Sequence, residues 1–261
     1  MDKEDNNDSG SKHFKKVIGA NVAIGEKNDF TIDNPEKEIL NKLAKSQRRI
    51  IFIINHQTQK YVFLSDNVYE IINISRKKLW ENGYNLLIKS VAVNDQLYIA
   101  RLLEYGFNFI NENFTTNEIL DLSYTFTYRL IDDKGESLQA LQRGNILKIN
   151  ESKQPVIESG MLININHWKK TDHLLFFIKS GKKSLLLLHR SGENEVKELK
   201  LSYAQLKVLK CFAKGYNSNQ TALELKISKY TVDTHRKNIL SKTGFSDTNA
   251  LIHFAKEAGI I

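Results

Sequence analysis

The stretch ISKYTVDTHRKNILSKTG, residues 227–244, has the pattern of one helix with a defined start and a defined end. Ser228 is a favourable N-cap, because its hydroxyl can accept a hydrogen bond from the first helical turn. Gly244 suits the left-handed backbone that commonly follows a helix. The segment therefore predicts a helix over Lys229–Lys242.

The two sides of this helix differ in chemistry. At 100° per residue, Val232 and Ile239 fall on one side and predict a buried stripe. This arrangement suits a helix that packs on one side and reads base edges on the other. An ordinary amphipathic surface helix has the same pattern, so the interpretation depends on the neighbouring sequence. The opposite side carries mostly polar side chains: Tyr230, Thr234, Lys237 and Ser241, flanked by Asp233 and Asn238.

Further helices are predicted around it. Two helices joined by a turn of three or four residues are the helix-turn-helix arrangement, whose second helix enters the major groove of DNA. The turn here is Lys226–Ser228, between a short helix and the Lys229 helix. The remaining predicted helices are Tyr203–Lys214, capped by Ser202 and ended by Gly215; Asn217–Leu225; and a fourth ending near Ala258–Gly259, capped by Ser246 or Asp247.

Positive charge is concentrated in the same region. Residues 198–261 contain ten Lys or Arg and five Asp or Glu, a net charge of +5, out of +8 for the whole chain. The other 197 residues carry only +3. Such a distribution favours a polyanionic partner, and with a helix-turn-helix the partner expected is double-stranded DNA.

The C-terminal sequence resembles the LuxR/GerE-type helix-turn-helix without a gap over Leu201–Ile261. Three positions depart from that pattern: Gln205 replaces the usual glutamate, Thr221 the usual isoleucine and Thr243 the usual leucine. Each change is expected to weaken a contact by about 1 kcal/mol. The matching positions are Leu201, Ser202, Val208, Leu209, Ala213, Gly215, Ala222, Leu225, Ile227, Ser228, Thr231, Val232, Thr234, His235, Asn238, Ile239, Leu240, Lys242 and Gly244.

The resemblance implies site residues and partners. Asp233 is unusual, because a carboxylate repels phosphates but can accept from cytosine N4; it either determines specificity or is only tolerated. Domains this small usually bind as pairs, so a homodimer is expected, and contact with RNA polymerase is a further expectation. The implied base-reading residues are Asp233, Thr234 and Lys237, with Tyr230 nearby, and the implied phosphate contacts are Ser218, Asn219, Lys229, Arg236 and Lys242.

The N-terminal part has the pattern of a mixed α and β domain over residues 36–188, after a polar tail at 1–33 and before a linker at 189–198. In Tyr124–Leu130, apolar and polar residues alternate, which predicts a strand with one packed and one solvated face. The other elements expected are a hairpin (Ile50–Ile54, Tyr61–Leu64), short helices (Val68–Ile74, Ser75–Asn82), a helix from Asn94 to about Asn111, strands Ser137–Ile149 and Ile157–His167, and a second hairpin (Leu174–Lys179, Ser184–His189).

This order of elements resembles a PAS domain. The segments SDNVYEIINIS at 65–75 and YRLIDDKGE at 128–136 are similar to PAS strand passages. VNDQ at 93–96 stands where many PAS sequences start a helix with His-Pro-Asp-Asp. The resemblance implies a sensory or dimerisation domain with an unidentified signal. The fold class expected is therefore α+β, a PAS-like antiparallel sheet with helices followed by a four-helix DNA-binding domain.

Composition excludes several other functions. Cys211 is the sole cysteine, so neither an intrachain disulfide nor a cysteine-based zinc site is expected, and the thiol lies in the wrong half for flavin photochemistry. The scattered histidines give no support to haem or metal ligation. No catalytic motif stands out, so no enzymatic activity is expected. The polar N-terminus lacks a signal peptide, and lysines interrupt the apolar segment Leu174–His189, which predicts a cytoplasmic protein without a membrane span.

Three alternatives compete with a PAS-regulated transcription factor. A response regulator would need an N-terminal receiver of alternating strands and helices, whereas an antiparallel meander is predicted here. An acyl-homoserine-lactone receptor shares the C-terminal pattern, but its pocket residues have no counterpart. A protein-interaction adaptor that binds DNA only nonspecifically fits the same sequence, and it would lack a preferred DNA site.

Overall fold

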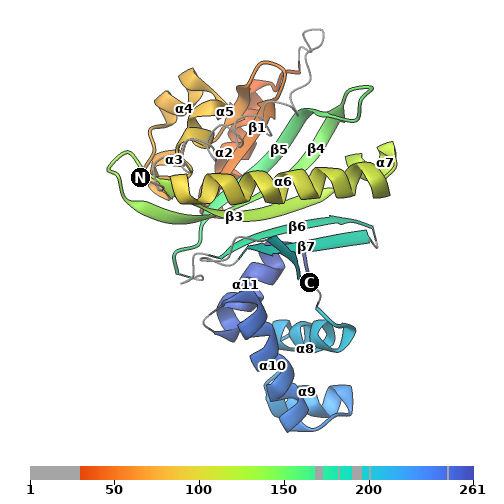
Figure 1. The fold of residues 1–261 in the computed structure, drawn as a ribbon. Coiled ribbons are helices and arrows are strands. Elements are labelled where there is room, and N and C mark those ends of the chain that lie inside the picture. The colour runs from red at the N-terminus through yellow and green to blue at the C-terminus, as the bar shows by residue number, and fades with distance from the viewer. Residues whose placement is uncertain (1–29, 168–172, 182, 190–195, 200, 246) are drawn as a thin grey trace, which may run out of the picture.

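The computed structural model describes residues 30–167, 173–181, 183–189, 196–199, 201–245 and 247–261. The described strands form one antiparallel sheet in the order β2-β1-β5-β4-β3-β6-β7-β8, with helices against both faces (Figure 1). The strands are β1 (Ile50–Asn55), β2 (Lys60–Leu64), β3 (Ser123–Ile131), β4 (Ser137–Ile149), β5 (Pro155–Asn164), β6 (Leu174–Ser180), β7 (Lys183–His189) and β8 (Val196–Glu198). The helices are α2 (Asn34–Ser46), α3 (Val68–Ile72), α4 (Arg76–Asn82), α5 (Tyr84–Lys89), α6 (Val93–Asn113), α7 (Thr116–Leu120), α8 (Tyr203–Ala213), α9 (Ser218–Leu225), α10 (Lys229–Thr243) and α11 (Thr248–Glu257).

The α+β fold class is confirmed, and the order of elements behind the PAS resemblance is present. The β1–β2 hairpin is followed by short helices, the long helix α6 and the meander β3-β4-β5. The VNDQ segment does start a helix, although the cap is Ala92 rather than Asn94. Helices α2, α5 and α7 were not expected. Residues 1–29 of the predicted tail at 1–33 lie outside the described residues. Asp33, at the end of that predicted tail, is the N-cap of α2.

The sheet is wider than the sequence patterns predict. β6 pairs with β3 through Phe176 and Phe126, so the second hairpin continues the sheet instead of leading away from it. His189 ends β7, and Val196–Glu198 forms β8, so both ends of the region predicted as a linker belong to strands. Residues 190–195 of that region lie outside the described residues.

Strands β3, β6 and β7 are buried on both faces, which corrects the prediction of a solvated face for Tyr124–Leu130. Thr125 and Thr127 are 1% and 0% exposed. Thr127 Oγ1 accepts a hydrogen bond from the backbone N–H of Leu175, and Thr125 Oγ1 donates to the carbonyl of Ala258. This face of β3 is not solvated, because helices from the C-terminal region cover it. The uninterrupted apolar runs of β6 and β7 have the same cause, since each face of these strands needs apolar side chains.

The two faces carry separate cores. The inner face packs against α3–α7, and the long helix α6 crosses it (Figure 1). On the outer face, sheet residues and C-terminal helices form one cluster. The members of this outer cluster are Leu141, Ile163, Ile165, Leu175, Phe177, Leu186, Leu188, Leu209, Ile239, Phe245, Ala250, Leu251, Phe254, Ala255 and Ala258.

The outer cluster includes the apolar face of α11. Leu251, Phe254 and Ala255 are buried among sheet residues and the other C-terminal helices. In this arrangement the face is unavailable to a second copy of the chain.

Polar contacts fasten the C-terminal end of α11 to the sheet. Arg49 pairs with Glu257 at 3.3 Å, and Arg143 donates to the backbone carbonyl of Glu257 at the same distance. Lys179 Nζ donates to the carbonyl of Gly259 at 3.3 Å. These contacts join residues far apart in the sequence, so both halves of the chain contribute to the attachment.

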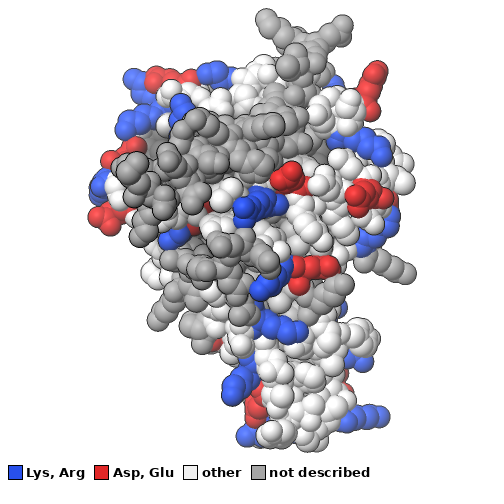
Figure 2. All heavy atoms as spheres, viewed as in Figure 1, with Lys and Arg blue, Asp and Glu red and all other residues white. Residues whose placement is uncertain are grey.

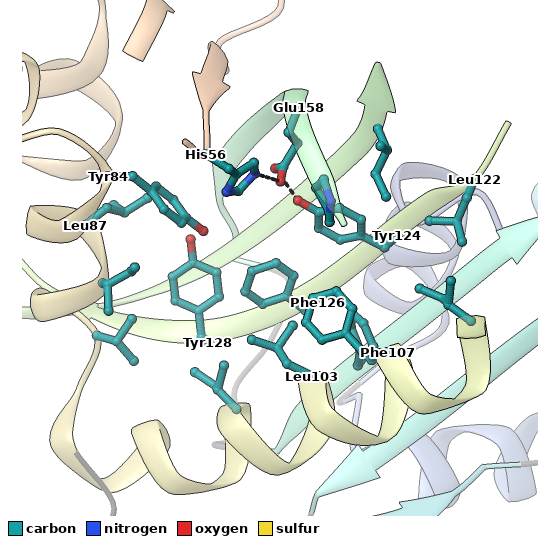
Figure 3. Close-up of a pocket in the computed structure, with 17 residues that line it drawn as sticks. His56, Tyr84, Leu87, Leu103, Phe107, Leu122, Tyr124, Phe126, Tyr128 and Glu158 are labelled. Atoms are coloured by element: carbon teal, nitrogen blue, oxygen red, sulfur yellow. Dashed lines mark hydrogen bonds and ion pairs between the residues drawn. The ribbon is translucent and has the colours of Figure 1, made fainter. Parts of the chain in front are cut away.

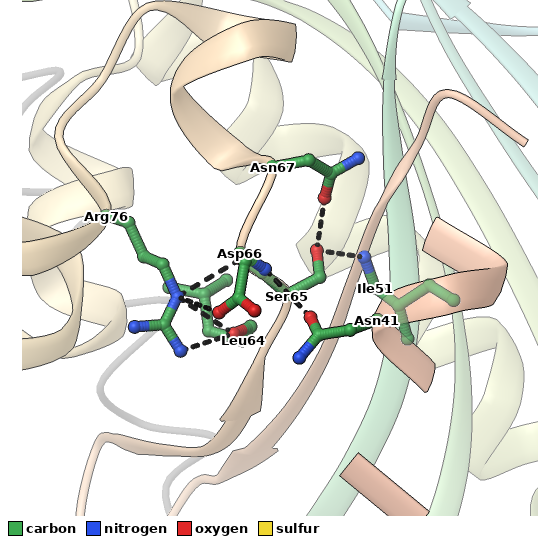
Figure 4. Close-up of polar contacts among 7 residues, drawn as sticks. All are labelled: Asn41, Ile51, Leu64, Ser65, Asp66, Asn67 and Arg76. Atoms are coloured by element: carbon green, nitrogen blue, oxygen red, sulfur yellow. Dashed lines mark hydrogen bonds and ion pairs between the residues drawn. The ribbon is translucent and has the colours of Figure 1, made fainter. Parts of the chain in front are cut away.

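The passage from β2 to α3 is held by a polar network that includes the SDN of the PAS-like segment (Figure 4). Ser65 Oγ accepts from the backbone N–H of Ile51 and donates to Asn67 Oδ1 at 2.8 Å. Asn41 of α2 accepts from the backbone N–H of Asp66. Arg76 of α4 donates to the carbonyl of Leu64. Because Ser65 and Asn67 are buried, these bonds are needed to satisfy their polar atoms.

In the described part of the chain no helix has the length and apolar character needed to cross a bilayer. The same residues contain no cluster of three or more His, Cys, Asp and Glu side chains arranged to hold a metal.

The three departures from the LuxR/GerE pattern are buried. Gln205 completes a capping box with Ser202 in α8. Its side-chain amide therefore makes the hydrogen bond to the Ser202 backbone that a glutamate would make. Thr243 Oγ1 donates to the carbonyl of Ile239 at 2.8 Å. Thr221 in α9 is 0% exposed, and among the described residues its hydroxyl has no hydrogen-bond partner. Of the three departures, Thr221 is therefore the one that we expect to lower the stability of the domain.

Phe254→Ala should lower the free energy of unfolding by about 3–5 kcal/mol, because this ring is buried between the sheet and the C-terminal helices. Urea denaturation followed by circular dichroism measures the change. Tyr203→Ala, at a position 75% exposed, is the control and should change stability by less than about 0.5 kcal/mol. Equal effects of both substitutions would show that Phe254 is not in a packed core.

Thr221→Val should raise the free energy of unfolding by about 1 kcal/mol or more, because it removes a buried hydroxyl without a partner and keeps the side-chain shape. Thr243→Val is the matched control and should lower stability, since its hydroxyl is hydrogen-bonded. Thermal and urea denaturation of both variants measure the difference. Destabilisation by Thr221→Val would contradict the burial described here.

Candidate nucleic-acid interface and internal cavity

Local sequence places α9 and α10 as predicted. Ser228 caps α10 by accepting from the backbone N–H of Thr231, and Gly244 ends the helix with φ of 75°. Lys226 adopts the left-handed conformation at the end of α9 and makes the turn between the helices. Val232 packs with residues of α8 in the small core of these helices. The observed helix, Lys229–Thr243, is one residue longer than the predicted helix Lys229–Lys242.

The outward side of α10 is open. Tyr230 is 82% exposed, and Thr234 and Lys237 are also exposed, whereas Val232 and Ile239 are buried. The buried Ile239 of α10 belongs to the same apolar cluster as sheet and α11 residues, and the exposed side chains of the outward side are not members of it. The orientation that sequence analysis requires for base reading is therefore present.

Asp233 is tied to two of the predicted phosphate-contact residues. Its Oδ1 accepts from the Ser218 hydroxyl at 2.7 Å and lies 3.5 Å from an Arg236 guanidinium nitrogen. These contacts join the start of α9 to the first turns of α10. One carboxylate oxygen of Asp233 thus already has two partners within the protein. Asp233 orients Ser218 and Arg236, in addition to any contact that it makes with DNA itself.

The other predicted phosphate-contact residues lie around α10. Asn219 and Lys229 are exposed, and Lys242 is partly buried with its Nζ 3.5 Å from Gln205 Oε1. Figure 2 shows Lys and Arg atoms at both edges of the helical C-terminal part in this view, with a few Asp and Glu atoms beside them and a largely uncharged area between.

A second candidate site is a cavity of about 90 Å³ between α6 and the inner face of the sheet. Leu103 and Phe107 of α6 point towards Phe126 and Tyr128 of β3 across it (Figure 3). Gly106 lets α6 approach, because a Cβ there would lie 2.2 Å from the ring of Phe176. Apolar side chains make up most of its wall, including Leu87, Ile88, Val91, Ile99, Ile110, Leu122 and Ile146.

One end of the cavity is polar. Glu158 of β5 is 5% exposed, and its Oε2 lies 2.8 Å from His56 Nε2. The Tyr124 hydroxyl donates to Glu158 Oε1 (Figure 3). Gly144 makes room for the Tyr124 ring, because a Cβ there would lie 2.4 Å from it. A buried carboxylate, an imidazole and a phenol thus meet at the same end.

The phenols around Glu158 are held in their protonated form. Burial raises the pKa of Tyr84, Tyr124 and Tyr128 above the usual value for a phenol, and the nearby Glu158 carboxylate raises the pKa of all three further. Tyr128 donates to Gln142 Oε1 at 2.8 Å. At neutral pH these phenols remain hydrogen-bond donors.

The sequence patterns did not predict this cavity. The alternating pattern of β3 predicted that Tyr124, Phe126 and Tyr128 share a packed face, and they do. His56 was counted only among scattered histidines. A glutamate inside the predicted strand Ile157–His167 was the available signal, because an acid on the packed face of a strand needs a partner.

Similar solved structures include the Vibrio cholerae VqmA dimer without target DNA, at 13% identity over 87% of this chain and 89% of that chain, with a TM-score of 0.33. A complex of Vibrio cholerae VqmA with ligand and DNA has 14% identity over 87% and 88%, with a TM-score of 0.28. These scores are too low to support an inference about fold or function.

Curated relatives match part of the chain. The response regulator protein TodT of Pseudomonas putida is 40% identical over 88 residues, which are 32% of this chain. The transcriptional regulatory protein LiaR of Bacillus subtilis is 32% identical over 112 residues, which are 38% of this chain. The chain spans 38% of the length of TodT and 53% of that of LiaR.

The family model described as "Bacterial regulatory proteins, luxR family" matches residues 199–255. This match covers α8, α9, α10 and most of α11, the helices that carry the open face of α10. Residues 199–255 of this chain therefore form a helix-turn-helix domain of the luxR family of bacterial regulatory proteins.

Proposed function

We propose that this protein regulates transcription by placing α10 in the major groove of double-stranded DNA. The observation that carries the proposal is the open outward side of α10, with Tyr230, Thr234 and Lys237 exposed while the opposite side is buried. A buried inner side fixes the helix, and exposed donors can read base edges. The names of the curated relatives, a response regulator and a transcriptional regulatory protein, support the same class of function.

The proposed contacts follow from position. Lys237, Thr234 and Tyr230 contact bases, while Lys229, Asn219 and Lys242 contact phosphates. The luxR-type domain is small, so it binds two half-sites about one helical turn apart as a homodimer. Because the sheet covers the apolar face of α11, this homodimer forms through another surface. Contact with RNA polymerase stays a prediction.

The domain over residues 36–188 is the regulatory part of this proposal. A cavity with an apolar wall and a few polar groups at one end has the composition of a small-molecule site. β3 and β6 line the cavity with one face. On the opposite face, Thr125 of β3 bonds to the carbonyl of Ala258, and Leu175 and Phe177 of β6 share an apolar cluster with the C-terminal helices. Occupancy of the cavity can therefore alter the attachment of the DNA-binding helices and change DNA affinity.

Lys237→Ala should weaken binding to a specific duplex by about 1–3 kcal/mol and leave binding to random duplex nearly unchanged, because a base contact is lost. Lys242→Ala should weaken binding to both duplexes alike, because a phosphate contact carries no sequence information. The specific duplex is first selected from genomic fragments bound by the full chain. Fluorescence anisotropy over a series of salt concentrations then measures both affinities.

An equal loss on specific and random duplex for Lys237→Ala would contradict the proposed orientation of α10. Failure to select any preferred duplex, with only salt-sensitive affinity, would favour the nonspecific adaptor over the regulator.

A further inference from the structure

The polar end of the internal cavity points to a class of ligand, and this inference rests on the regulatory role proposed for that cavity. We propose that the cavity binds a small amine, with an apolar body among the side chains of α6 and β3 and an ammonium group at Glu158. The charge, the free hydrogen-bonding capacity and the size of the site support this class of ligand.

Among the described residues that line the cavity, Glu158 is the sole carboxylate, none is Lys or Arg, and the one imidazole, His56, lies against Glu158 Oε2 at 2.8 Å. A carboxylate is costly to bury unless donors surround it. An ammonium ion beside it gains a charge-assisted hydrogen bond, whereas an anionic ligand would meet a like charge in a poorly solvated space. The charge of the wall therefore selects cations over anions.

Glu158 retains accepting capacity after its internal contacts. A carboxylate has about four lone-pair sites, and His56 and Tyr124 each occupy one. Both of its oxygens are already oriented by these partners, so a ligand donor meets a prearranged acceptor. The raised pKa of Tyr124 keeps its proton on the phenol, directed at Glu158, so this phenol does not compete as a second anion.

Size limits the body of the ligand. An engineered apolar cavity of about 150 Å³ binds benzene, and this cavity measures about 90 Å³. A branched chain of four carbons fits such a space better than a ring with a long substituent. Leu103, Phe107 and Phe126 supply the apolar contacts for that chain (Figure 3).

The test uses three probes of the same branched shape: isobutylamine, isobutanol and isobutyrate. Saturation-transfer NMR and calorimetry on the full chain at neutral pH measure their dissociation constants. Isobutylamine should bind most tightly, isobutanol about tenfold more weakly, and isobutyrate more weakly still. Glu158→Gln should remove the advantage of the amine over the alcohol, because it removes the charge at nearly constant size.

Two further variants separate the site from general damage. Leu103→Trp fills the cavity and should abolish binding of all three probes, whereas Tyr105→Trp, on an exposed position of the same helix, should leave binding unchanged. If Glu158→Gln does not fold, the binding of the three probes is measured on Tyr124→Phe instead. This substitution frees one oxygen of Glu158 and should preserve the preference for the amine.

Isobutyrate binding as tightly as isobutylamine would overturn the proposal, as would the absence of amine binding or amine binding that Leu103→Trp leaves intact. Duplex affinity is measured on the same preparations. Sequence-specific DNA binding without amine binding refutes the ligand class and leaves the regulator proposal standing. Amine binding without sequence-specific DNA binding refutes the regulator and leaves the ligand site standing.

Discussion

The covering of the sheet on both faces is the constraint on which the rest of this structure depends. Strands β3, β6 and β7 have helices α3–α7 on one face and the luxR-type helices on the other. Thr125 and Phe126 are neighbours in the chain, yet one bonds to the end of α11 and the other lines the cavity. A change on the inner face is therefore one residue away from the attachment of the DNA-binding helices.

The luxR-type region was predictable because its signals are local. Ser202, Ser228 and Gly244 lie next to the helix ends that they determine. In α10 the apolar side chains recur with the period of a helix. The same holds for the hairpin β1–β2 and for α4, which Ser75 caps. The capping box of Asp33 and Glu36 was an equally local signal for α2, and the sequence analysis did not use it.

The rest depends on contacts between distant segments, which local patterns do not report. The alternating pattern of β3 predicts that its threonines are solvated, but the C-terminal helices cover this face. There Thr125 bonds to the carbonyl of Ala258, and Thr127 accepts from the backbone N–H of Leu175 in β6. Glu158 meets His56 and Tyr124 only after β1, β3 and β5 are assembled in one sheet. Asp233 reads as an independent groove-facing acid, but Ser218 of the preceding helix already occupies one of its oxygens.

The shared outer core links the candidate cavity to the candidate DNA surface, so the proposed regulation depends on its existence in solution. NMR of the full chain, with labelled leucine methyl groups and labelled phenylalanine rings, detects this core. If it is present, nuclear Overhauser effects are expected between the leucines of β6 and β7 and the rings of Phe245 and Phe254. Absence of these effects, while those within the sheet and within the helices persist, would contradict the existence of this core.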